Sequence, residues 1–519
     1  MFSALKNKLK GLYGKVTGTQ TIETVLGVNS NISSEMQGAL SRWRNMYQDK
    51  APWLKEPTNE SPERVVSLGL AKQIAAEKAR MACLEMKTEI TSSKDIKESR
   101  DIETGLVYIE PIDSSDISRA KYLNAEYQRL IIDNIQNQLE LGIALGGFVA
   151  KPYVNKNSDN KYDFAVDFSQ ADDFIPISFD NNGNLTEAAF IEKIVIDNYI
   201  YRRIEHHKYV AGKAIVTNKA FRAEKTKHLN NSELGKEVSL TSVPQWSALA
   251  EEAVITSDRP LFAYFKMPIA NSIDTKSPLG MSVYGGAAEN LIRDADEQYS
   301  RTIWEFEGAE MAIDMDVSYV KHTKDSNGNI VRDALPRKQE RLYRMHDYDE
   351  NASGWNIHAP SIRDVSLING LNEIKREIER ACAIAPGTIS DPNDVAKTAE
   401  EIRSGKPASV SSTIDIQKAL ENTLEHIVYI MSVYASLYKM CPDGEYEVSF
   451  EWGNGIKEDP DKEAARKMSE IDRGLATEVD YLEYQYGLTR KQAIDKVKEI
   501  QRYNTWKATV NADDEGNMQ

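Results

Sequence analysis

Two long amphipathic stretches, separated by a charged insertion, constrain this chain more than any other feature of its sequence. The first covers roughly residues 282–311, and the second covers roughly residues 364–385. In each stretch, apolar residues recur at steps of three and four, which places them on one helical face. The apolar positions of the first are Ala288, Leu291, Ile292, Ala295, Tyr299, Ile303 and Phe306, and those of the second are Leu367, Leu371, Ile374, Ile378 and Cys382.

Each stretch has turn or stop signals at one end. Ser277-Pro278-Leu279-Gly280 precedes the first helix as a turn, and Pro386-Gly387 stops the second. Stripes this narrow need a partner helix, so the pair predicts a subunit that packs side by side with copies of itself. Two ordinary amphipathic helices within a globular enzyme are the alternative.

The bulk composition is that of a protein that folds in water. The chain has 519 residues, enough for two to four domains, and 28% of them are charged. No apolar run approaches the ~18 residues that a membrane-spanning helix needs, and the first residues lack the apolar core of a secretion signal. The cysteines, Cys83, Cys382 and Cys441, have no pairing pattern, which favours a reducing compartment and structural, buried roles for the three thiols.

The formal net charge of −16 argues against a protein that grips nucleic acid over a wide surface. An acidic protein can still surround DNA, and its low affinity would let the polymer slide. Tight phosphate contacts would slow that movement, because each one adds salt-dependent affinity.

The first half of the chain predicts helices beside an antiparallel sheet. Residues 1–20 predict a short basic amphipathic helix, either a frayed arm or a docking segment, and residues 41–60 predict an ordered connector. Helices follow at residues 61–89, begun by Ser61-Pro62, and at about 117–144. From residue 148 to residue 267 the apolar period changes to two, which predicts strands and hence an α+β fold.

The second half predicts a long polar loop at residues 388–407 and then a helix from about residue 413 to about residue 440. A strand follows at residues 446–452, and residues 460–507 predict a broken helical segment. Polar loops this long inside a compact domain are often functional. The alternative for the loop, whose cations are Lys397, Arg403 and Lys406, is an ordinary surface loop.

Motifs for common enzyme chemistry are missing from the sequence. None of its Gly-Lys pairs is followed by Ser or Thr, which argues against a P-loop ATPase. The segments starting at Asp180 and at Asp325 begin like EF-hand loops but lack the required Gly and Glu, so both predict hairpin turns. His206 and His207 are adjacent on a predicted strand, so their side chains diverge rather than share a zinc ion. A nuclease that uses scattered carboxylates stays open.

One stretch is basic, against the trend of the chain. Residues 321–344 contain seven Lys and Arg residues and three acidic residues. This stretch lies in the insertion between the two predicted helices. It predicts either a solvated hairpin or an electropositive end that meets DNA or an acidic partner.

The order of these elements resembles the portal proteins, or head–tail connectors, of tailed bacteriophages, especially long-tailed phages of Gram-positive hosts. The resemblance covers roughly residues 40–505. It rests most on Ser277-Pro-Leu-Gly with the helix after it, on Ile384-Ala-Pro-Gly, and on the run Ala396-Lys-Thr-Ala-Glu-Glu-Ile. Each motif is short, and their order and spacing carry the match.

The resemblance implies a portal-type α+β fold in nine parts. These are an N-terminal arm (1–40), an α+β wing (41–281), stem helix 1 (282–311), a small α/β clip (312–362), stem helix 2 (363–386), a tunnel loop (387–407), the long wing helix and strand (408–456), a helical crown (457–507) and a disordered tail (508–519).

The resemblance also implies three sets of functional residues. The tunnel loop would meet DNA through Asp394, Lys397, Thr398, Glu400, Glu401, Arg403 and Lys406. The clip would dock partners through Lys321, Lys324, Arg332, Arg337, Lys338, Arg341 and Arg344. The stem would pack through Leu291, Ile292, Tyr299, Ile303, Leu371, Ile374 and Ile378.

A protein of this family is expected to be a non-enzymatic ring, usually of twelve copies, at one capsid vertex. It would have no cofactor and no metal, and it would pass double-stranded DNA without sequence specificity during packaging and ejection. Its partners would be the terminase large subunit, the head–tail adaptor, and the major capsid and scaffolding proteins, with no membrane involved. It would be found in the virion, after assembly in the host cytoplasm. The alternatives are a metal-dependent nucleic-acid enzyme and another head or baseplate structural protein.

Overall fold

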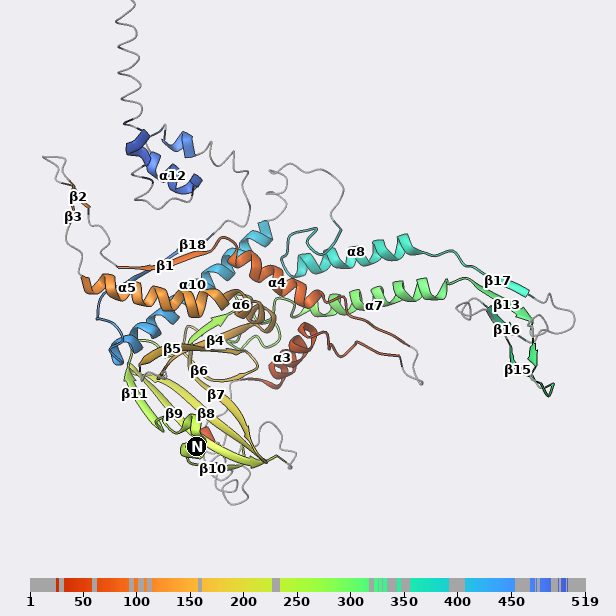
Figure 1. Ribbon diagram of the computed structural model, residues 1–519, viewed down its shortest axis with the longest axis horizontal. Helices are drawn as coiled ribbons and strands as arrows, with labels where there is room; N and C mark the ends of the chain where they lie inside the picture. The colour runs from red at the N-terminus through yellow and green to blue at the C-terminus, as the bar shows by residue number, and fades with distance from the viewer. Residues whose placement is uncertain are drawn as a thin grey trace, which may run out of the picture. The chain divides into compact units, whose positions relative to one another are not determined.

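The structure is a computed structural model that divides into two compact units, Met1–Trp452 and Gly453–Gln519 (Figure 1). Each unit is described by itself below. The first is described at residues 25–27, 32–57, 63–92, 98–100, 107–109, 114–156, 161–225, 234–316, 322–324, 326–328, 330–333, 343–346, 355–391 and 407–452. The second is described at residues 467–471, 473, 477–486, 493, 496–500 and 502.

The first unit combines helices with mainly antiparallel sheets, which confirms the predicted α+β class. Its N-terminal helices are α3 (Ser34–Tyr47), α4 (Leu70–Cys83), α5 (Ser114–Tyr127) and α6 (Asp133–Leu145). A π-helical turn, η1 (Gln128–Ile132), joins α5 to α6. This run agrees with the helix predicted at residues 117–144, and it ends at Gly146, whose φ of 90° only glycine adopts readily.

Helix α3 is a correction to the predicted connector, because residues 41–47 belong to it. The Ser33 side chain accepts a hydrogen bond from the Met36 backbone N–H, which caps the first turn. The helix buries Met36 and Trp43 in the main core. Burial of these large side chains, rather than the prolines that follow, decides the conformation of this segment.

The predicted start of the next helix at Ser61-Pro62 is also wrong, because α4 begins at Leu70. The backbone of Val65 forms an isolated bridge with Lys55. The Leu68 backbone N–H donates to the Asp296 carboxylate at 2.8 Å. These contacts to distant residues hold the segment before Leu70 extended, and a capping signal cannot override them.

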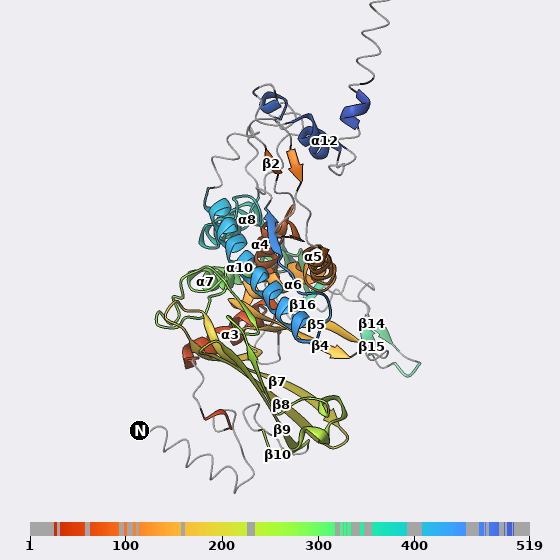
Figure 2. The same cartoon turned by 90° about the vertical axis from the view of Figure 1, so that its left-hand side faces the viewer.

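The larger sheet runs in the order β10-β9-β8-β7-β6, and β11 also pairs with β9 (Figure 2). Its strands are β6 (Phe174–Phe179), β7 (Leu185–Ile196), β8 (Tyr199–Val210), β9 (Lys213–Glu224), β10 (Lys236–Val238) and β11 (Glu252–Thr256). The Asp180 carboxylate accepts hydrogen bonds from the backbone N–H groups of Asn182 and Asn184, which confirms the predicted hairpin turn between β6 and β7.

A second, antiparallel sheet has the order β12-β4-β5 and lies against the helical core. Its strands are β4 (Gly147–Lys156), β5 (Tyr162–Gln170) and β12 (Ala263–Lys266), and two short 3₁₀ turns, η2 (Leu240–Ser242) and η3 (Pro244–Trp246), precede β12. A Cβ atom at Gly280 would lie only 1.9 Å from the Gly146 carbonyl oxygen. Glycine at the end of Ser-Pro-Leu-Gly therefore lets two backbones touch just before the first long helix.

Further helices described in the first unit are α7 (Ala287–Gly308), α8 (Asp364–Ala381) and α10 (Pro407–Leu437). All three were predicted, although α7 begins later and ends earlier, α8 ends earlier, and α10 begins at Pro407, before the predicted start near residue 413. The stripe predicted for α10 is buried, with Ile416, Leu420, Leu424, Ile427 and Met431 at 0% exposure. Beyond α10, β18 (Glu447–Glu451) pairs antiparallel with β1 (Lys87–Thr91), and β2 (Glu98–Arg100) pairs with β3 (Val107–Ile109).

Among the described residues of the insertion between α7 and α8 there are five short strands. They are β13 (Ala312–Asp316), β14 (His322–Lys324), β15 (Ile330–Asp333), β16 (Tyr343–His346) and β17 (Trp355–His358). β13 pairs in parallel with β16 and antiparallel with β17, while β14 and β15 form a hairpin, as the sequence starting at Asp325 predicted. The described part of the insertion is therefore β structure.

The second unit is helical where it is described, which agrees with the prediction for residues 460–507. It includes α12 (Glu478–Tyr486) and helical turns at residues 467–471 and 496–500. The basic helix predicted at residues 1–20 and the tail at residues 508–519 lie outside the described residues. In the part of the chain that is described, no helix is long and apolar enough to cross a membrane.

Candidate interface on the paired helices

Helices α7 and α8 lie side by side (Figure 1), and their inner halves belong to the core of their own chain. On α7, Ala288, Ile292 and Ala295 are buried, and on α8, Leu371 and Ile378 are buried. All five contribute to the main hydrophobic cluster. The inner halves are therefore structural, since they fix the pair to the rest of the first unit.

The outer halves of the same helices carry apolar side chains in water. Trp304 on α7 and Val365 on α8 are each 65% exposed, and Phe306 and Ile368 are close to half exposed. Where the chain continues beyond the helices, Met311 and Ile357 are about half exposed as well. Isolated exposed apolar residues are common, whereas a set on one helix pair marks a candidate contact surface.

Of the seven residues predicted to pack the stem, six lie against the chain's own core, and Ile303 does not. Ile292, Leu371 and Ile378 are buried, and Leu291, Tyr299 and Ile374 are half-buried against the main cluster. Ile303 is half-buried and lines a groove on α7. The structure thus brings these residues together within one subunit, and it leaves other side chains, above all Trp304, Val365 and Ile368, on the outer surface.

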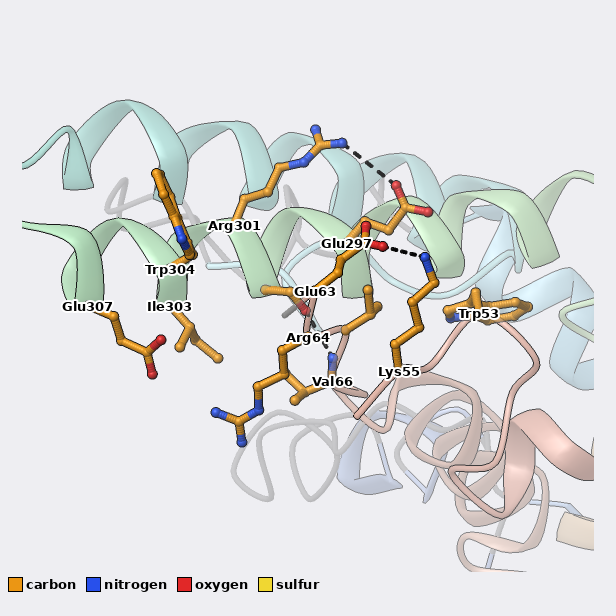
Figure 3. Close-up of a pocket in the computed structure, with 12 residues that line it drawn as sticks. Trp53, Lys55, Glu63, Arg64, Val66, Glu297, Arg301, Ile303, Trp304 and Glu307 are labelled. Carbon is orange, nitrogen blue, oxygen red and sulfur yellow. Dashed lines mark hydrogen bonds and ion pairs between the residues drawn. The ribbon is translucent and has the colours of Figure 1, made fainter. Parts of the chain in front are cut away.

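The groove beside α7 has a volume of about 520 Å³ (Figure 3). One wall is α7, which contributes Arg301, Trp304 and Glu307, and the other is formed by Trp53, Lys55 and residues 63–66. This second wall is fixed to α7 by hydrogen bonds from the Val66 backbone N–H to Ser300 Oγ at 2.9 Å and from Trp53 Nε1 to the Asp296 carboxylate at 2.9 Å. The two walls are therefore held together by partly buried contacts.

Asp296 is the buried acid under this groove. Its carboxylate accepts from Trp53 Nε1 and from the Leu68 backbone N–H, and its side chain is almost inaccessible to water. Burial raises the pKa of Asp296, and these two hydrogen bonds oppose the rise. The hydrogen bonds give this carboxylate a structural role, since both of its oxygens are used to hold the groove's outer wall against α7.

The inner end of α8 holds the start of the predicted tunnel loop. The buried Glu379 carboxylate accepts hydrogen bonds from the backbone N–H groups of Gly387, Ile389 and Ser390 and from Ser390 Oγ, at 2.8–3.1 Å. Four donors on one buried carboxylate fix residues 387–390 in a single conformation. The chain therefore leaves α8 along a defined path.

Lys78 on α4 ties both sides of the same loop together. Its Nζ donates to the Ala383 carbonyl oxygen and to Ser412 Oγ, each at 2.7 Å. Burial lowers the pKa of Lys78 to about 8. Since Ala383 precedes the loop and Ser412 lies in the first turns of α10, one side chain fixes the separation of the loop's two ends.

Many of the predicted site residues lie outside the described residues. This applies to the whole tunnel-loop set, Asp394, Lys397, Thr398, Glu400, Glu401, Arg403 and Lys406, and to Lys321, Arg337, Lys338 and Arg341 of the clip set. Lys324, Arg332 and Arg344 are placed on β14, β15 and β16. These three strands belong to the same small module, but they lie in two separate sheets.

The histidine pair on β8 belongs to an ion network inside the first unit. His206 Nε2 contacts Glu187 at 2.9 Å and His207 Nε2 contacts Glu205 at 2.7 Å, so the two rings have different partners. Burial alone would raise the pKa of Glu205, but the hydrogen bond from His207 and the charge of Lys151 lower it well below its usual range. Among the described residues, no group of three or more His, Cys, Asp or Glu side chains is placed to hold a metal ion.

The comparisons with known proteins give no family assignment. No protein-family model matches the chain, and no curated protein matches it.

Proposed function

We propose that this chain is the repeating subunit of a ring-shaped portal at one vertex of a tailed-phage capsid. The ring, usually of twelve copies in such assemblies, would pass double-stranded DNA inward during packaging and outward during ejection. The observation that carries the proposal is the contrast within α7 and α8, whose inner halves are buried and whose outer halves expose Trp304, Val365 and Ile368.

The exposed outer halves support self-association on energetic grounds. Fully burying one large apolar side chain is worth about 1.5–3 kcal/mol, and the outer halves offer several of them on a rigid pair of helices. A ring places identical helix pairs beside one another, so the same side chains are covered in every copy. Self-association would therefore bury apolar side chains of the outer halves that folding of the single chain leaves exposed.

The order of elements also supports a portal. The helix pair α7 and α8 is interrupted by a small β module, and it is followed by a loop whose ends are fixed by Glu379 and Lys78. We propose that the module, residues 312–362, docks the terminase large subunit and later the head–tail adaptor. The loop, residues 387–407, would face the channel, and the capsid and scaffolding proteins would contact the rest of the ring.

The charge of the chain agrees with a conduit rather than a DNA-binding protein. Each copy has a formal charge of −16, so the ring as a whole repels the phosphate backbone. Weak phosphate binding lets DNA move without large salt-dependent barriers. The proposed role is passive, with the energy for DNA movement supplied by a partner motor.

Purification of the full chain tests this proposal. Native mass spectrometry should show one closed oligomer, and electron microscopy should show rings with a central hole wide enough for a DNA duplex. A chain that stays monomeric at micromolar concentration overturns the proposal. Assemblies without a central hole would instead favour another structural protein of the phage particle, and metal-dependent DNA cleavage by the pure chain would favour an enzyme.

A further inference from the structure

Arg202 on β8 is a buried cation without a partner among the described residues. The residue is 5% exposed, and its Nη1 atom, although buried, has no hydrogen-bond partner. Within the described ranges, no ion pair reaches its guanidinium either. Burial lowers the pKa of Arg202, and no neighbouring charge offsets this change. Because arginine keeps its proton in proteins, the fold retains an unbalanced positive charge at this position.

The register of the large sheet places two more cations beside Arg202. Strands β7, β8 and β9 are neighbours in this sheet (Figure 2). Lys193 of β7 is directly opposite Arg202, and Lys219 of β9 is its diagonal neighbour, two residues from the opposite Phe221. Both lysines are exposed and have no partner in the described part of the chain. Cβ atoms of opposite residues are ~5 Å apart and those of diagonal neighbours ~7–8 Å, so the ends of these side chains can meet at one small ligand.

The face of the sheet that holds Arg202 is positive, although the chain as a whole has a net charge of −16. Side chains alternate between the two faces along a strand. The acid of β7, β8 and β9 on this face is Glu187, which already contacts His206 at 2.9 Å and Lys208 at 3.6 Å. The charges of the opposite face, by contrast, are paired within the sheet. The Lys and Arg residues of the three strands on the positive face are Lys193, Arg202, Lys208, Lys213 and Lys219.

The acid that comes next on this face lies too far away to balance Arg202. Glu237 of β10 is opposite Phe221, which in turn is opposite Arg202. Two strand spacings, or about 9.5 Å, therefore separate the backbones of Glu237 and Arg202. Glu237 is exposed, so it lies at the rim of the three cations rather than against the guanidinium.

The remaining surroundings of Arg202 are apolar. Ile204 and Phe221 lie on the same face and form a small buried cluster with Leu234, and Val25 and Leu26 pack against this cluster. Apolar groups exclude water and lower the local dielectric constant. An ionic contact beside them is therefore stronger than the same contact in bulk water.

We propose that Arg202, Lys193 and Lys219 form a binding site for a free or terminal phosphate group. The guanidinium matches two phosphate oxygens with two parallel N–H groups, and the lysines add point charges. Three unpaired cations suit a group whose charge at pH 7 is about −1.5 to −2 better than a single carboxylate or a phosphodiester, which carries one charge. The site lies within one chain and does not depend on the proposed ring.

Isothermal titration calorimetry of the full chain with inorganic phosphate tests the site. The wild-type chain, in a phosphate-free buffer at constant ionic strength, should bind one phosphate per chain. Arg202→Gln should weaken the affinity by about tenfold or more, because it removes the paired donors. Lys193→Gln should weaken it by roughly threefold, since a single point charge is lost. Lys193 is exposed, so this second variant tests the site even if Arg202→Gln does not fold.

The matched control is Lys213→Gln on the same face of the sheet. Lys213 is opposite Val210, which is eight residues beyond Arg202 on β8, or about 27 Å away. This variant loses the same charge at a distance, and its phosphate affinity should stay within about twofold of wild type.

Melting temperatures give an independent readout. Without phosphate, Arg202→Gln should melt no lower than wild type, because the variant removes a buried charge that has no partner. Added phosphate should raise the melting temperature of wild type more than that of Arg202→Gln, since a ligand that binds the folded chain stabilises it. The rise common to both reflects the general effect of phosphate on apolar burial.

Three outcomes would overturn the inference. The first is no heat of binding from wild type up to about 10 mM phosphate, and the second is equal affinity in wild type, Arg202→Gln and Lys193→Gln. The third is a DNA duplex without terminal phosphates that binds through Arg202 and is displaced by phosphate, because the site would then recognise a phosphodiester backbone. A chain that binds phosphate but forms no ring would support this site and remove the proposed function.

Discussion

The inner and outer halves of the α7–α8 pair have similar amphipathic sequences and opposite surroundings. Ile292 and Ile378 are buried in the main core, whereas Trp304 and Val365 are 65% exposed on the same two helices. The inner half packs into the core of its own chain, whereas among the described residues Trp304 and Val365 of the outer half stay mostly exposed. An apolar stripe on a helix therefore indicates that the helix packs against a partner. Where the stripe lies in the fold decides whether that partner belongs to the same chain.

The largest effect is expected at the buried anchor of the inner half. Replacement Glu379→Ala leaves the N–H groups of Gly387, Ile389 and Ser390 without their acceptor, and we expect a loss of at least about 3 kcal/mol in the free energy of unfolding. Urea denaturation measures it. The matched control is Glu377→Ala on the exposed side of α8, which should change stability by less than about 0.5 kcal/mol. Equal losses in the two variants would contradict the anchor role.

A same-residue comparison separates the two halves directly. Ile292→Ala removes a side chain that is 2% exposed and should cost about 3 kcal/mol, because it leaves a cavity in the core. Ile368→Ala, in the outer half, should cost less than about 0.5 kcal/mol in the dissociated subunit. Thermal denaturation of both variants below the concentration of assembly gives the two values. The distinction between the halves is wrong if Ile368→Ala destabilises the single subunit as much as Ile292→Ala.

The smallest effect on stability is expected at the ion pair between Arg363 and Glu305, which joins the outer halves of the two helices. Arg363, whose side chain is 71% exposed, donates from Nε and a terminal nitrogen to the Glu305 carboxylate, whose side chain is 10% exposed, at 2.9 and 2.7 Å. Arg363→Ala should lower stability only slightly, and 1 M salt should remove most of the difference from wild type. Melting temperatures at low and high salt test this, and a difference that persists in 1 M salt would show that the pair does more than a surface ion pair.

The sequence predicted the long elements well, because their periodicity is a local property. The stripe of α10 is buried as expected, and the strands β7, β8 and β9 follow the alternating pattern. The failures come from contacts between distant residues. The segment before α4 is extended because Leu68 and Val66 bind α7, and α3 is a helix whose buried face meets the same core.

The candidate site was harder to predict than the fold. Periodicity identified the stripe of Ile292, Leu371 and Ile378, which the structure uses within one subunit. Trp304, Val365 and Ile368 lie off that stripe. Their exposure is known only from the structure, in which their neighbours on the two helices are buried. A signal was present in the sequence, since a tryptophan and aliphatic residues off the main stripe are unusual on a solvated helix face. The anchors Lys78 and Glu379 gave no such signal, because their partners are backbone groups far away or in an irregular turn.

The pairing of β18 with β1 has a mechanical consequence. β18 is the last described strand before residue 453, and it is hydrogen-bonded along its length to β1, with Trp452 bonded to Glu421 of α10 at its end. A pull directed along β18 would therefore load the whole β1–β18 ladder in shear rather than open it one bond at a time.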